Sequence, residues 1–188
     1  MGFLRTYGPR LGVFALIVGV FAGILALHLN SRNREAADVG LRLDRALALP
    51  EDELDKRITE LRGILKDSPG CEAEPWVSLA LGDQLFRRAQ ASKADEARRF
   101  AEEAYAVFSA IPRKTPAHAA APLALFSAGC AAEELGKPAE ALRLYNELQD
   151  NYGQSYLVSG GDKSLRESHV QGLTERVQKY REAFPSGS

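Results

Sequence analysis

Residues 123–153 read LALFSAGCAAEELGKPAEALRLYNELQDNYG, and this stretch decides the fold. Alanine and leucine are abundant on both sides of Gly136-Lys137, and these residues favour helix. The stretch therefore predicts two helices, Leu123 to Leu135 and Pro138 to about Asn151, joined by a glycine-containing turn. A helical hairpin of this kind is the unit from which we build the rest of the chain.

Small residues predict where the helices of such hairpins meet. Gly129 lies inside the first helix of the stretch, Ala141 lies early in the second, and Tyr145 follows four residues later. Gly82 occupies the corresponding place in an earlier helical pattern. A glycine inside a helix costs about 1 kcal/mol relative to alanine, so we expect a close helix contact to explain it. Gly82, Gly129, Ala141 and Tyr145 are the predicted repeat-packing residues.

The first of two earlier hairpins is predicted from residues 31–69. A helix over 31–49 is followed by a second helix that is expected to start at Pro50, because proline suits the first helical position. Ser68-Pro69-Gly70 ends that second helix. Its apolar positions step by four, three and four residues and predict a buried stripe: Leu54, Ile58, Leu61 and Leu65.

The next hairpin is predicted from Pro75 to Pro112. Its helices meet at a turn over residues 91–93, and Pro112 and Pro116 are expected to bracket a linker to the following hairpin. A final helix is predicted from Lys163 to Phe184, with one apolar side and one side rich in charge. That pattern is typical of a helix that caps the end of a helical array.

Residues 11–29, LGVFALIVGVFAGILALHL, contain no charged side chain. A helix of this length spans ~28 Å, close to the hydrocarbon thickness of a bilayer. The apolar region of a cleaved signal peptide is shorter, about 7–15 residues, and precedes a small-x-small cleavage site that Leu27-His28-Leu29-Asn30 does not supply. We therefore predict an uncleaved single-pass anchor, with a tail over 1–10 and a folded domain over 30–188.

Ala15, Gly19 and Gly23 recur every four residues and share one face of the predicted anchor. Small residues at this spacing allow two membrane helices to approach closely. The pattern predicts a transmembrane helix contact that could form a homodimer, and it leaves the oligomeric state open.

Arg5 and Arg10 are the only charged residues among residues 1–30, so the rest of the chain carries 22 basic against 25 acidic residues. A mildly acidic domain without a basic stripe argues against nucleic acid as a partner. Arginines flank both ends of the predicted anchor, so charge does not decide its orientation.

No pattern in the sequence predicts a catalytic, cofactor or metal site. His28, His118 and His169 are widely spaced and none has a second ligand at metal-binding spacing. Cys71 and Cys130 could form a disulfide in an oxidising compartment, but Cys130 lies beside Gly129 on a helix that is expected to pack, and a small buried hydrophobic residue is the favoured interpretation. The sequence therefore predicts a protein that is not an enzyme.

The string from Glu134 to Tyr145, ELGKPAEALRLY, resembles the inter-helix turn and second helix of the tetratricopeptide repeat. This resemblance implies an all-α fold in which the transmembrane helix predicted above is followed by a degenerate tetratricopeptide-like array of about three hairpins and a C-terminal capping helix. The layout of one membrane helix, Asn30-Ser31-Arg32 and a repeat domain is similar to the ancillary Sec-translocon subunit family of bacteria. That family implies anchoring in the inner (cytoplasmic) membrane, with the soluble domain on the periplasmic side.

The expected function is that of a membrane-anchored scaffold that binds protein partners at the cell envelope, in protein translocation or chaperoning. The partners would be peptide segments or subunits of a membrane complex, and the groove beside Leu123–Gly153 is the first place to look for them. The alternative is an accessory subunit of a larger integral membrane complex, docked through its transmembrane helix. The sequence leaves open whether the anchor or the repeats provide the main interface.

Overall fold

The structure is a computed structural model, and it describes residues 31, 34–155, 178 and 182. The described part of the chain contains helices and no strand, which confirms the predicted all-α class. None of the described helices is long and apolar enough to cross a membrane. The predicted anchor over 11–29, with Ala15, Gly19 and Gly23, lies outside the described residues, as does the predicted capping helix except for two of its residues.

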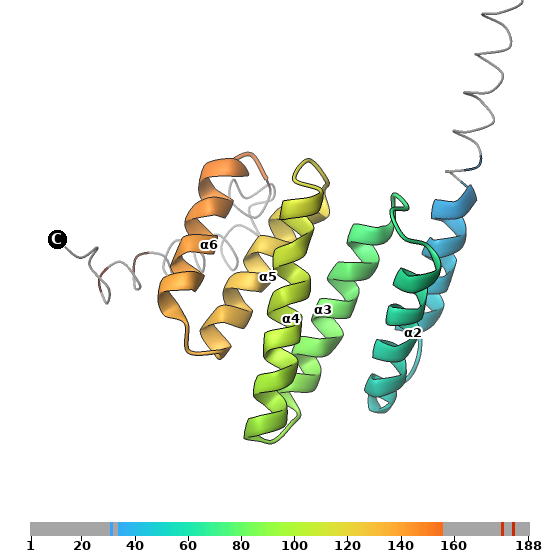
Figure 1. The fold of residues 1–188 in the computed structure, drawn as a ribbon, viewed down its shortest axis with the longest axis horizontal. Coiled ribbons are helices and arrows are strands. Elements are labelled where there is room, and N and C mark those ends of the chain that lie inside the picture. Colours follow the sequence, from blue (N-terminus) through green and yellow to red (C-terminus); the bar gives the residue numbers. More distant parts are fainter. Residues whose placement is uncertain (1–30, 32–33, 156–177, 179–181, 183–188) are drawn as a thin grey trace, which may run out of the picture.

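The helices are arranged as three successive antiparallel hairpins (Figure 1). From α2 onward each α-helix packs against the next along the chain, and α3 also contacts α5. In chain order the helices are 34–47, the 3-10 helix η1 (Glu51–Glu53), α2 (Leu54–Asp67), α3 (Glu74–Gln90), α4 (Ala94–Lys114), α5 (Ala120–Glu134) and α6 (Pro138–Asn151). The first helices of the hairpins are therefore 34–47, α3 and α5.

The first hairpin differs from its prediction at the start of its second helix. Pro50 is extended, with φ −55° and ψ 151°, and precedes η1 rather than opening an α-helix. The α-helix begins one short turn later, at Leu54. The predicted stripe is found on α2, where Ile58 and Leu61 are buried and the other two leucines pack against the core. Gly70, with φ +75°, lies in the turn after α2, where a residue with a side chain would be strained.

Arg57 joins the first hairpin to the second through a buried guanidinium group. Its side chain is only 8% exposed. Its Nε and Nη2 donate to the carbonyl of Leu49, and its Nη1 lies 3.4 Å from the Oε1 of Gln84 on α3. Because a buried cation needs acceptors, these contacts fix the connection after helix 34–47 against both α2 and α3.

The predicted linker from Pro112 to Pro116 was wrong, because Pro112 lies inside α4, which continues to Lys114. A proline so close to the end of a helix removes one backbone bond and leaves little helix to distort. Other contacts secure this end: the carbonyl of Ile111 accepts bonds from the N–H and the hydroxyl of Thr115, at 2.9 and 3.0 Å. The linker therefore covers residues 115–119, and α5 begins before Leu123, at Ala120.

Candidate functional site

The predicted packing residues lie where the two helices of a hairpin touch. A Cβ added to Gly129 would lie 2.2 Å from Cε1 of Tyr145, and one added to Gly82 would lie 2.4 Å from Cε1 of Phe108. Ala141 and Tyr145 are both fully buried. The two later hairpins therefore use the same arrangement, in which a glycine of the first helix receives an aromatic ring from the second.

Tyr145 is held in this position by its hydroxyl group. The hydroxyl donates to Oε1 of Glu133 at 2.9 Å and lies 3.6 Å from Sγ of Cys130. Its ring also packs beside Phe126, with centroids 6.0 Å apart. Glu133 is half-buried and contributes to this contact.

An apolar groove runs along the first helices of the three hairpins, and we call it the first-helix groove. It encloses about 470 Å³, with α3 as its floor and helix 34–47 and α5 on either side. Its apolar lining comprises Leu43, Leu47, Trp76, Leu79, Phe108 and Leu123. Leu47 and Trp76 are 38% and 40% exposed, which is unusual for large apolar side chains beside a core.

Trp76 is the largest apolar side chain in the first-helix groove, and its ring is positioned by a neighbour. The ring meets that of His118 edge to face, with centroids 5.4 Å apart. His118 is itself fixed, because its Nδ1 accepts the N–H of Ala120 at 3.1 Å at the start of α5. An exposed aromatic ring held in one orientation loses little entropy on binding, which suits it as an anchor for a partner.

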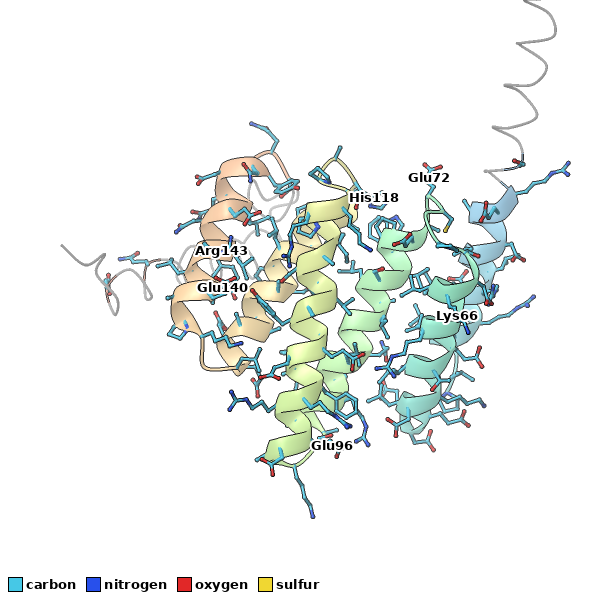
Figure 2. All side chains as sticks on the ribbon, viewed as in Figure 1. Lys66, Glu72, Glu96, His118, Glu140 and Arg143 are labelled. Atoms are coloured by element: carbon cyan, nitrogen blue, oxygen red, sulfur yellow. The ribbon has the colours of Figure 1, made fainter. Side chains whose placement is uncertain are left out.

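A second, larger groove lies between α2 and α4 at the end where the connections between hairpins lie. We call it the loop-end groove. It encloses about 1030 Å³ and is lined mainly by apolar residues, including Leu65, Pro69, Leu81, Val107, Ile111 and Pro116. Figure 2 shows Glu72 and His118, which also line it, at this end of the fold. The two grooves open on opposite sides of α3.

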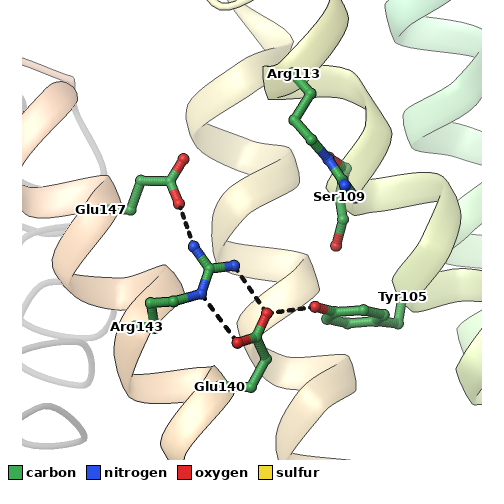
Figure 3. A network of polar contacts seen from close by, with 6 residues as sticks. All are labelled: Tyr105, Ser109, Arg113, Glu140, Arg143 and Glu147. Carbon is green, nitrogen blue, oxygen red and sulfur yellow. Dashed lines mark hydrogen bonds and ion pairs between the residues drawn. The ribbon is translucent and has the colours of Figure 1, made fainter.

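A polar network joins α4 to α6 on another part of the surface (Figure 3). Tyr105 donates to Glu140, and Arg143 donates to both carboxylate oxygens of Glu140, at 2.9 and 2.8 Å. Arg143 also donates to Glu147 at 3.0 Å. The bonds from Arg143, and then from Tyr105, lower the pKa of Glu140 to about 2. Burial, followed by the bond to Glu140, raises the pKa of Tyr105.

We expect the substitution Glu140→Gln to destabilise the fold by about 1 kcal/mol at pH 7, a modest cost because solvent screens the half-exposed pair. Because the folded pKa is depressed, ionised Glu140 stabilises the fold above its unfolded pKa, about 4.3, and this contribution is lost as the pH falls toward 2. Chemical denaturation of both proteins should therefore give a difference that is constant above about pH 5 and vanishes near pH 2. A pH-independent difference would contradict this assignment.

The network is a structural contact rather than a reactive centre, because its charges are mutually paired and it lines neither groove. Among the described residues no three potential metal ligands lie close enough to hold an ion. Cys71 and Cys130 are both half-buried thiols, and no disulfide joins them. The grooves are thus the features of the described part of the chain that suit a binding partner.

The sequence anticipated only part of the first-helix groove. Leu123 and Ser127, from the stretch that was expected to lie beside a partner site, line one side of it. Its floor and opposite side come from α3 and helix 34–47. Periodicity alone does not show that the apolar face carrying Trp76 stays partly uncovered.

Comparison of the chain with protein-family models, with curated proteins and with solved structures found no match.

Proposed function

We propose that this protein is a membrane-anchored helical-repeat scaffold that binds protein partners through the first-helix groove. The observation that carries the proposal is the pair of exposed apolar side chains, Leu47 and Trp76, beside half-buried leucines in one groove. Arrays of helical hairpins bind other proteins along such surfaces. No catalytic role and no cofactor is part of the proposal.

The partner that best fits the groove is an amphipathic helix. The floor of the groove is a helix, and helices on either side supply apolar side chains, so an incoming apolar helical face would meet leucines and an aromatic ring. On α3 the carboxylate of Asp83 also lines the groove, and it already accepts bonds from Arg87 and Gln84. The groove therefore offers mainly apolar contact, with little unpaired charge to attract a polar ligand.

The proposed membrane anchor, repeat family and cellular location rest on the sequence. The hairpin over 123–153 resembles a tetratricopeptide repeat, and residues 11–29 have the length and flanks of a membrane anchor. An anchor would confine the groove to a membrane surface and raise its effective concentration toward partners there. The layout similar to the bacterial ancillary Sec-translocon subunit favours the periplasmic side of the inner membrane and a role in translocation or chaperoning.

A second candidate is an accessory subunit that docks through the anchor and the helix that follows it. The observation in its favour is Leu41, which is 57% exposed on helix 34–47 and lines neither of the two grooves. A large apolar side chain exposed beside the predicted anchor would suit a contact with a neighbouring subunit.

Trp76→Ala and Leu41→Ala separate these two functions. We expect Trp76→Ala to reduce the recovery of co-purifying partners in mild detergent about tenfold. An aromatic side chain that becomes buried against a partner contributes a large share of the binding energy. Leu41→Ala should leave the recovery unchanged. Quantitative mass spectrometry of the purified full-length proteins measures both, and the opposite pattern would favour the accessory subunit.

A further inference from the structure

We infer that the loop-end groove holds the apolar juxtamembrane segment of a second, membrane-inserted protein. The inference rests on the proposed anchoring of this chain but concerns a different groove from the one that carries the proposed function. It follows from where the groove lies, from what lines it and from the charge at its rim.

The loop-end groove lies at the end of the fold where helix 34–47 begins. Helix 34–47 runs antiparallel to α2, and Arg42 forms an ion pair of 2.7 Å with Asp67, the last residue of α2. The turn after Asp67 lines the groove, and helix 34–47, drawn in blue in Figure 1, begins at the same end of the fold. From Arg42 back to residue 34 the helix extends ~12 Å further in this direction, at 1.5 Å per residue.

This position brings the groove close to the proposed bilayer. Only four residues separate residue 34 from Leu29, the last residue of the predicted anchor. The five steps from Leu29 to residue 34 reach at most about 18 Å, so the groove lies within about 30 Å of the proposed membrane surface. A groove so placed would meet segments of other proteins just outside the bilayer before it met segments from the soluble phase.

The lining of the groove favours an apolar occupant. Its apolar surface comes from α2, α3 and α4, and several of its polar atoms are already bonded within the chain. The hydroxyl of Thr115 donates to Ile111, Nδ1 of His118 accepts from Ala120, and the carboxylate of Glu74 accepts from Gly70. A polar ligand would find few groups to orient it, whereas an apolar peptide segment would cover the exposed carbon atoms.

The charge at the rim argues for a peptide rather than the lipid surface itself. Glu72 is exposed at the mouth of the groove, and Glu74 lies beside it, 3.8 Å from Lys114. A surface that docks on anionic lipid headgroups carries clustered basic residues, whereas this rim has one lysine, Lys114, paired with Glu74, and the exposed carboxylate of Glu72. Basic residues commonly flank membrane spans, and Glu72 could accept one of them.

The test places a photoreactive amino acid at Val107, a half-buried lining residue on α4, in the full-length chain in cells. We expect its crosslinks, identified by mass spectrometry, to fall within about 15–20 residues of membrane spans of other proteins. Ser78→Arg should reduce their yield about tenfold, because Ser78 lines this groove. Ala80→Arg is the matched control, two residues along the same helix but in the first-helix groove.

The outcomes are distinct. Crosslinks to soluble proteins, to lipid or to segments far from any span would overturn the inference, as would equal yields with Ser78→Arg and Ala80→Arg. Release of the chain from membranes by alkaline carbonate would overturn both the anchoring and this inference. If Trp76→Ala leaves co-purification unchanged while the Val107 crosslinks persist, the first-helix groove fails as the site of the proposed function and the loop-end groove stands.

Discussion

The substitution Gly129→Ala is expected to lower the free energy of unfolding by about 2 kcal/mol, and Gly129→Leu by more, through overpacking. The added Cβ would lie 2.2 Å from the ring of Tyr145. That ring has no room to move, because it is fully buried and its hydroxyl is bonded to Glu133. Denaturation of the full-length protein in mild detergent, followed by the emission of Trp76, the only tryptophan, measures the change.

Two other helical glycines supply controls for this prediction. A Cβ at Gly63 would meet nothing within 4 Å, so Gly63→Ala should stabilise the fold by up to about 1 kcal/mol. A Cβ at Gly82 would meet the ring of Phe108, but that ring borders the first-helix groove and has no hydroxyl to hold it. We therefore expect Gly82→Ala to cost less than Gly129→Ala. Equal stability of the Gly129 and Gly63 variants would show that the helices do not pack as described.

The substitution Arg57→Met is expected to destabilise the fold by about 2 kcal/mol. Methionine fills much of the same space but donates no bonds, so the carbonyl of Leu49 and the side chain of Gln84 lose a charged donor. Because Arg57 joins the connection after helix 34–47 to α2 and α3, we expect the first hairpin to lose the most stability. Hydrogen exchange should show weaker protection there than in α5 and α6.

Arg45→Met is the matched control for Arg57→Met. Arg45 is exposed on helix 34–47, and surface substitutions usually change stability by no more than about 0.5 kcal/mol. A similar effect of the two substitutions on the denaturation midpoint would mean that the buried contacts of Arg57 contribute nothing specific.

Local chemistry explains how much of the fold could be predicted from the sequence. The turn at Gly136-Lys137 and the start of α6 at Pro138 were placed correctly, because Gly136 has the positive φ that glycine favours and proline suits the first turn. The helix was predicted to end at Pro112, which was wrong. A proline in a sequence does not show whether the helix stops there or continues for a few more residues. Its position became clear only from the contacts that secure the end of α4.

The candidate site was harder to predict from the sequence, because it depends on apolar side chains that the rest of the fold leaves uncovered. Leu47 and Trp76 belong to apolar helical patterns that look the same whether they face the core or solvent. Their exposure follows from the spacing of helix 34–47, α3 and α5, which depends on all three hairpins together. The polar network around Glu140 likewise joins side chains from α4 and α6 that lie far apart in the sequence.

In-cell photocrosslinking from position 47 compared with position 41 tests the central proposal most directly. Leu47 lines the first-helix groove and Leu41 lies outside it on the same helix. The full-length chain with a photoreactive residue at position 47 should give discrete crosslinks to protein partners that Ala80→Arg removes, whereas position 41 should give only background. Discrete crosslinks from position 41, with none from position 47, would contradict binding through the groove.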